Sequence, residues 1–158
     1  MLKRLGSMGA VLGVAALAVG SVAPATGNGS ADRHGNDRDK IAVLSDNTEE
    51  EFVDVGAPNF SLGDAFIFTS KLTKHGKQVG RTGVVCTVTS TAAEETQCVG
   101  TARLRGGQIT IQGLLAGEPS VFKFPITGGT GAYEGAEGTL VVREISDTKE
   151  LLTFHLSD

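Results

Sequence analysis

The two cysteines are the residues whose types and spacing most directly suggest chemistry. Cys86 and Cys98 flank the segment TVTSTAAEETQ. If a hairpin tip lies at residues 91–93, Ser90 opposes Glu94, and residues whose numbers sum to 184, including the two cysteines, face each other. Directly opposed Cβ atoms lie roughly 4.5–5.5 Å apart, which is close to disulfide range. The sequence therefore predicts a Cys86–Cys98 disulfide; the alternative is a free Cys86 thiol that acts as a nucleophile.

A glycine-rich segment, GGTGAYEG at residues 128–135, invites comparison with nucleotide-binding loops. The GxGxxG frame that starts at Gly129 would require glycine at position 134, where the chain has Glu134. No long helix is predicted after it, so no helix N-terminus would meet a pyrophosphate. The segment is better interpreted as a tight turn that leads into a strand.

Other catalytic and metal-binding patterns do not occur in the sequence. His34, His75 and His155 are isolated, and neither HExxH nor GxSxG is present. Glu134 and Glu137 could form a carboxylate pair for glycoside chemistry, but near a turn they are more simply solvated. We expect no metal site and no cofactor.

The elements that must position any site are strands. From Ile41 onward apolar residues recur with a period of two, and Gly, Asn, Asp and Lys interrupt the pattern. The pattern predicts strands at residues 40–46, 51–55, 63–73, 79–90, 95–105, 108–115, 121–127, 138–145 and 150–156. Residues 130–135 are expected to form at most one helical turn. The fold class is all-β, a closed antiparallel barrel with an apolar interior.

Side-chain parity assigns an interior face to these strands. Small residues at Gly100 and Ala102 should leave volume inside the barrel, and an eight-stranded barrel of this kind can hold one small ligand. Five phenylalanines supply apolar lining, although we expect some of them to lie outside: Phe66, Phe68, Phe122, Phe124 and Phe154. The candidate ligand-binding residues are Asp64, Phe66, Phe68, Ser70, Val84, Leu104, Ile111 and Glu144.

The 158-residue chain divides into three parts. Lys3 and Arg4 precede an apolar stretch that ends in Ala23-Pro24-Ala25, so residues 1–25 are predicted to be a signal peptide cleaved after Ala25; a retained membrane anchor is the alternative. Residues 26–39 are polar and Gly-rich, and are predicted to be a flexible N-terminal segment. Residues 40–158 form the barrel domain of a protein that we expect to be secreted.

Composition limits the partners. The formal net charge is −4, and no Lys/Arg cluster is apparent along the barrel sequence. Phosphate neutralisation requires a cationic surface, so a nucleic-acid partner is not expected. No second apolar run approaches the length of a membrane span, so we expect no stable membrane insertion after processing.

Five ordered segments carry a resemblance to a known family. The stretches LGDAFIFTSKL, VGRTGVVC, GGQITIQG, FPITGGTGAYEGAEGTLVV and LLTFHL, between Leu62 and Leu156, resemble the allene oxide cyclase barrel family, and the glycine-rich one also resembles dirigent proteins. The resemblance implies a calycin-like, eight-stranded antiparallel barrel, often trimeric, with an apolar pocket at its mouth. It also implies enzymes that steer ring closure or radical coupling of apolar intermediates.

The resemblance carries over to individual residues only in part. Phe68 matches the family's pocket aromatic and Cys86 its pocket cysteine. An acidic residue and an asparagine of the family's first strand fall on Ala42 and Leu44, a second asparagine on Ser70 and a cavity tyrosine on Gly106. Allene oxide cyclisation itself is therefore not expected, although the barrel and its apolar pocket are expected to be retained.

Three functions remain open from the sequence. The first is a cyclase or coupling guide, isomerase-like, that folds a flexible apolar substrate into a reactive shape. The second is a non-catalytic carrier of a lipid-like or polyketide-like ligand. The third is a structural barrel with a packed interior, whose outward apolar residues form a homotrimer or homodimer.

Overall fold

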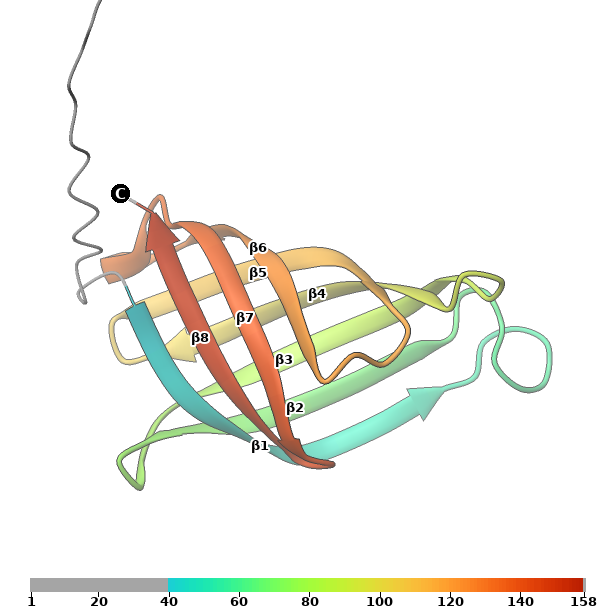
Figure 1. The fold of residues 1–158 in the computed structure, drawn as a ribbon, viewed down its shortest axis with the longest axis horizontal. Helices are drawn as coiled ribbons and strands as arrows, with labels where there is room; N and C mark the ends of the chain where they lie inside the picture. Colours follow the sequence, from blue (N-terminus) through green and yellow to red (C-terminus); the bar gives the residue numbers. More distant parts are fainter. Residues whose placement is uncertain (1–39, 158) are drawn as a thin grey trace, which may run out of the picture. The chain divides into compact units, whose positions relative to one another are not determined.

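The protein folds into a closed antiparallel barrel of eight strands (Figure 1). The computed structural model describes residues 40–157, so the predicted signal peptide and flexible segment lie outside the described residues. The strands are β1 (Lys40–Val53), β2 (Ala65–Lys74), β3 (Lys77–Ser90), β4 (Glu95–Leu104), β5 (Gly107–Ala116), β6 (Val121–Gly129), β7 (Glu137–Ser146) and β8 (Lys149–Ser157). The predicted eight-stranded antiparallel barrel is confirmed. No helix within residues 40–157 is long and apolar enough to cross a membrane.

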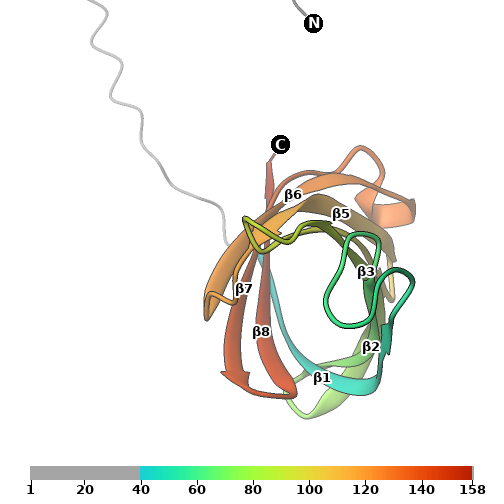
Figure 2. The same ribbon diagram turned by 90° about the vertical axis from the view of Figure 1, so that its right-hand side faces the viewer.

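Each strand pairs with its neighbour in the chain, and β1 pairs with β8 to close the cylinder (Figure 2). A meander of this kind needs only connections between adjacent strands, and most of them are short, whereas residues 54–64 form a longer β1–β2 loop. The short 3₁₀ helix Gly131–Tyr133 follows β6, where one helical turn was expected. The ladder between β5 and β6 is the shortest, since it pairs only residues 109–111 with residues 126–129.

The first strand differs from its prediction. Two separate strands at 40–46 and 51–55 were expected, whereas β1 runs without a break from Lys40 to Val53 and contains a bulge between Asn47 and Glu49. The acidic residues that follow resemble a loop in composition, but the ladder to β2 continues through them as far as Val53. Because a bulge adds one residue, the interior face changes from odd to even positions: Ser45 faces inward before it and Glu50 after it.

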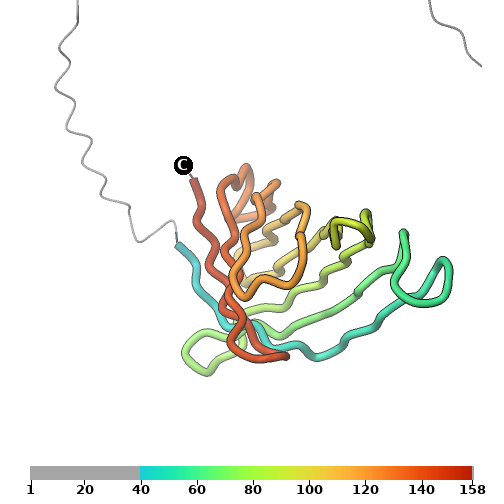
Figure 3. Tube along the Cα trace, turned by 45° about the vertical axis from the view of Figure 1, so that its right-hand side comes forward, coloured from blue at the N-terminus to red at the C-terminus, as the bar shows by residue number. Residues whose placement is uncertain are grey.

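The two ends of the barrel differ. One end is filled by buried aliphatic side chains, namely Val43, Leu72, Leu104 and Ile126. The other end carries the β1–β2, β3–β4, β5–β6 and β7–β8 connections; Figure 3 shows the first two of these loops on the same side of the barrel. A cavity therefore has to open toward the second end.

One glycine is required by the backbone of β7. Gly138 has a φ of +126°, and a Cβ atom built there would overlap the carbonyl oxygen of His155 on β8. L-residues with a side chain rarely adopt this conformation. The glycine therefore allows β7 to approach β8 directly after the turn that follows the 3₁₀ helix.

Candidate functional site

The barrel interior contains a cavity of about 1170 Å³. A drug-sized ligand occupies sites of roughly 300–1,000 Å³, so the space is sufficient for a small organic guest. Apolar side chains from every strand except β1 line it: Phe66, Phe68, Val84, Ile109, Ile111, Leu115, Phe122, Phe124, Leu140, Val142, Leu152 and Phe154, with the small residues Gly100 and Ala102 on β4. The interior is a container rather than a packed core.

All five phenylalanines named from the sequence line this cavity, so the expectation that some lie outside is wrong. Phe122 and Phe124 share a face because they are two residues apart on β6, and their rings meet edge to face with centroids 5.5 Å apart. At the mouth, Phe60 of the β1–β2 loop lies 6.4 Å from the Phe66 ring, centroid to centroid. The aromatic wall thus extends from the interior into a loop.

Five of the eight candidate ligand-binding residues lie on the cavity wall: Phe66, Phe68, Val84, Ile111 and Glu144. The remaining three do not. Leu104 belongs to the filled end of the barrel, because β4 continues past the cavity to the closed end. Ser70 is buried, and its hydroxyl donates to Asn47 Oδ1 at 2.7 Å.

Asp64 is fully buried but organises the β1–β2 loop instead of lining the cavity. Its carboxylate accepts hydrogen bonds from the backbone amides of Val55 at 2.9 Å, Gly56 at 3.4 Å and Ser61 at 2.6 Å, and from the Ser61 hydroxyl at 3.2 Å. The Val55 amide above all, with those of Ser61 and Gly56, lowers the pKa of Asp64 against the opposing effect of burial. The residue therefore holds the loop at the mouth in its folded form.

The two first-strand positions matched to the family, Ala42 and Leu44, do not line the cavity. Leu44 is 46% exposed and points away from the interior, as does the side of β1 that carries Ala42, whereas the neighbouring Ser45 and Asn47 line the cavity. The polar groups missed from the sequence lie here and on β3, since Thr82 also lines the cavity. Strict alternation from Val43 would have found Ser45 and Asn47, because an interior Val43 makes the odd positions interior.

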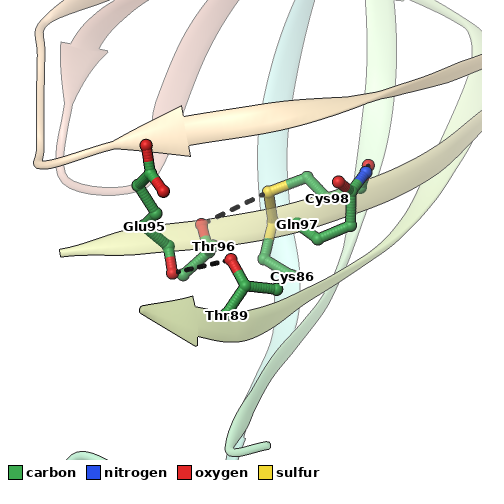
Figure 4. The surroundings of a disulfide bond; sticks show 6 residues. All are labelled: Cys86, Thr89, Glu95, Thr96, Gln97 and Cys98. Carbon is green, nitrogen blue, oxygen red and sulfur yellow. Dashed lines mark hydrogen bonds between the residues drawn. A yellow bond between two sulfur atoms is a disulfide. The ribbon is translucent and has the colours of Figure 1, made fainter. Parts of the chain in front are cut away.

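The predicted disulfide is confirmed, and the alternative of a free Cys86 thiol is wrong. Cys86 and Cys98 pair directly across β3 and β4, with Cα atoms 4.0 Å apart, and both contribute to the cavity wall (Figure 4). Ser90 opposes Glu95 rather than Glu94, because the ladder shifts between Val88 and Ser90. The shift lies beyond the cysteines, so their pairing is unaffected.

The charged residues that line the cavity are all acidic, and they gather near its mouth: Glu50, Glu94, Glu118, Glu144, Asp147 and Glu150. Glu144 on β7 and Glu150 on β8 are direct cross-strand partners. Burial raises the pKa of Glu150, and the charge of Glu144 raises it further. No group of three His, Cys, Asp or Glu side chains within residues 40–157 is placed to hold a metal ion.

The glycine-rich segment lies at the other end of the barrel. Gly131–Tyr133 forms the 3₁₀ helix, the Ala132 amide donates to the Gly106 carbonyl at 2.9 Å, and Tyr133 packs against the core. Its backbone groups thus bond to the β4–β5 turn, which agrees with the interpretation of the segment as a turn. Glu134 and Glu137 are exposed there, as are His75 and His155 elsewhere on the surface.

Comparisons with known proteins agree with this geometry. Residues 40–156 match the family described as allene oxide cyclase barrel like domain. A solved structure named pyocyanin demethylase is 30% identical, with a TM-score of 0.68, and the match covers 75% of this chain and 99% of that one. No curated protein sequence matches.

Two more distant structures share the fold. A Diels–Alderase from Streptomyces koyangensis is 16% identical with a TM-score of 0.59, over 75% of this chain and 65% of its own. A pterocarpan synthase dirigent protein is 20% identical with a TM-score of 0.57, over 75% of this chain and 96% of its own. At these identities the likeness shows a common barrel.

Proposed function

Since this chain belongs to the allene oxide cyclase barrel like family, we propose that it binds a small, largely apolar molecule inside the barrel and guides its cyclisation or coupling. The observation that carries the proposal is the cavity of about 1170 Å³ with its aromatic and aliphatic wall. Burial of apolar surface stabilises a bound guest by about 25 cal/mol per Å². The shape of the wall then selects a few of the guest's conformers.

Confinement is the catalytic principle in this proposal. Holding two reacting parts of one molecule in contact removes much of the entropic barrier to their reaction. A ring closure of this kind converts π bonds into ring σ bonds within one molecule, so mass is unchanged and no proton acceptor is needed. Coupling of two radicals would require a separate one-electron oxidant, and the barrel would set only their relative orientation.

A non-catalytic carrier is the second candidate, and a specific observation favours it. The two cysteines are joined, and the cavity wall carries neither histidine nor lysine. The wall therefore lacks the common pairing of a nucleophile with a base. A carrier needs only an apolar space with a few polar groups.

Binding can be tested with adjacent, matched variants. Val84 lines the cavity between Phe68 and Gly100, its cross-strand neighbours, whereas Val85 is 41% exposed on the outer face. We expect Val84→Trp to weaken binding of the neutral dye Nile red several-fold and Val85→Trp to leave it unchanged, as measured by dye fluorescence. Equal effects of the two substitutions would contradict binding inside the barrel.

Analysis of the product distinguishes a cyclase from a non-catalytic carrier. The protein is incubated with an achiral, tethered diene–dienophile, and the product is analysed by mass spectrometry and chiral chromatography. A faster isomerisation at constant mass, with one enantiomer in excess, supports a cyclase. Recovery of unchanged compound with the protein supports a carrier.

We further propose that the protein is secreted and forms a homotrimer or homodimer. The leader sequence supports export. Three aliphatic residues on the outer face, Ile67, Val85 and Val99, are direct cross-strand neighbours and are 40–50% exposed. Contiguous apolar surface of this kind is typical of contacts between subunits.

A further inference from the structure

The charge of the cavity is one-sided. Its wall carries six carboxylate residues and none of the chain's lysines, arginines or histidines. The ion pair found within residues 40–157 joins Lys149 and Asp46, with 4.0 Å between Nζ and Oδ2, and involves none of the six. Glu150 is half-buried and the other five are exposed, so Glu150 is the carboxylate that loses solvation without a cation beside it.

Two of these carboxylates form the centre of the acidic region. Glu144 and Glu150 oppose each other on β7 and β8, and such partners have Cβ atoms roughly 4.5–5.5 Å apart. On the other side of β8, Glu150 pairs with Ser45 of β1. A single row across three strands therefore presents a hydroxyl and two carboxylates to the cavity.

Two hydroxyl groups of the cavity wall are available to a ligand. Ser45 is 2% exposed and Thr82 is 8% exposed, and both line the cavity. None of the side-chain hydrogen bonds within residues 40–157 involves either hydroxyl, and no fully enclosed side-chain oxygen there lacks a partner, so both hydroxyls open into the cavity. Ser45 lies directly beside Glu150 in the ladder. An N–H group of a bound ligand could donate hydrogen bonds to the Ser45 hydroxyl oxygen and to the carboxylate of Glu150.

The spacing of the carboxylates and the aromatic side chains of the cavity wall indicate which kind of cation the cavity would bind. Within residues 40–157 no three carboxylate, histidine or cysteine side chains converge to coordinate a metal ion. Aromatic rings stand close to the mouth, among them Phe60, Phe66 and Phe68, and ring faces attract organic cations. An apolar body with one cationic N–H group satisfies the aromatic wall, the carboxylates and the hydroxyl together.

We propose that the barrel's guest is an organic cation, an apolar molecule with a protonated amine or similar nitrogen group, and that Glu144, Glu150 and Ser45 bind its charged end. This inference rests on the proposed function, because it assumes that the cavity holds a guest. It adds the chemical class of that guest and the direction in which it lies, with its charge toward the β7–β8 end of the mouth. Asp147 of the β7–β8 turn and Glu50 of β1 add negative potential around the same opening.

The experiment uses three probes with one naphthalene body: 1-naphthylmethylammonium, 1-naphthylmethanol and 1-naphthoate. Their affinities for the full chain are measured by isothermal titration at pH 7. We expect the ammonium compound to bind about tenfold more tightly than the alcohol, and the carboxylate most weakly. The affinity of the ammonium compound should fall with added salt, which screens the charges. It should also fall when the pH is lowered, because Glu150 then takes up a proton and loses its charge.

Matched variants locate the charge. Glu150→Gln and, separately, Glu144→Gln should each weaken ammonium binding about fivefold to tenfold and leave alcohol binding unchanged. Glu51→Gln removes the same charge from the outer face, where Glu51 pairs with the outward Ile67, and should change neither affinity by more than about twofold. Thermal unfolding of each variant confirms that it is folded.

The outcomes separate the two proposals. Equal binding of the ammonium compound and the alcohol, or equal effects of Glu150→Gln and Glu51→Gln, would overturn the cation inference while binding in the cavity stands. Failure of all three probes to bind, with Nile red also unbound, would overturn cavity binding itself.

Discussion

Breaking the Cys86–Cys98 bond should remove a defined amount of stability without changing the cavity. The two residues are separated by 12 positions and close the β3–β4 hairpin. In the chain-entropy description, opening a loop of that length costs about 3 kcal/mol at 25 °C, because the unfolded chain regains the conformations that the bond excluded. The ladder continues on both sides of the bond, through Val84–Gly100 and Val88–Thr96, so the folded barrel should keep its geometry.

The assay is urea unfolding of the oxidised protein and of the same protein with dithiothreitol. With a slope of about 1.5–2 kcal/mol per M, a loss of about 3 kcal/mol lowers the midpoint by about 1.5–2 M. The double variant Cys86→Ala/Cys98→Ala is the control, because its midpoint should not respond to dithiothreitol. Thiol titration of the unfolded, unreduced protein should find no free thiol.

Two results would refute this reasoning. A midpoint shift below about 0.5 M would mean that the reduced chain keeps its hairpin closed when unfolded, so that the bond excludes few conformations. A loss of Nile red binding on reduction, in protein that is still folded, would mean that the bond shapes the cavity wall.

Four further predictions concern the loop, the turn, the mouth and the surface. Asp64→Asn should accelerate amide hydrogen exchange in residues 54–63 above pH 4. In the parent protein, exchange in the same loop should accelerate as the pH falls through the lowered pKa of Asp64, because a carboxyl with a lowered pKa stabilises the fold only while it is ionised. Gly138→Ala should destabilise the barrel by about 2 kcal/mol or more, whereas Gly83→Ala, where a Cβ meets nothing within 4 Å, should be nearly neutral in denaturant unfolding. Glu150→Gln should raise the Tm of the unliganded barrel at pH 7 and lose this advantage below pH 4.5, since the raised pKa means that ionised Glu150 opposes folding; an unchanged Tm at both pH values would contradict it. Val99→Glu should convert an oligomer of the parent protein into monomers in light-scattering chromatography, and a parent protein that is already monomeric would refute the subunit contact.

Local patterns predicted much of the barrel. Period-two alternation located the strands because side chains on a strand point to opposite faces whatever lies beyond it. The cysteine pairing followed from counting away from one hairpin tip, and it survived an error of one residue at the tip because the irregularity lay between the tip and Val88. The turn at residues 130–135 followed from its glycines.

Register around the closed barrel could not be predicted in the same way. The bulge after Asn47 exchanges the faces of β1, and nothing in its composition marks it as a continuing strand. Ala42 and Leu44, the positions matched to the family's first strand, lie on the side of β1 that faces away from the cavity, and a shift of one residue moves every side chain to the other face. Asp64, Ser70 and Leu104 have the parity of interior residues, but parity does not give depth along the barrel.

The sequence by itself therefore determined most of the strands and the disulfide, because these depend on spacing within a strand or across one turn. Only the tertiary structure decided which residues share the cavity and what charge they give it. Glu144 and Glu150 join Ser45 through the β7–β8 and β1–β8 ladders, and on the outer face Lys71, Arg81 and Arg103 come together across β2, β3 and β4 although they are scattered along the chain. Closure of the barrel brings distant segments into register, and that register is a property of the whole sheet.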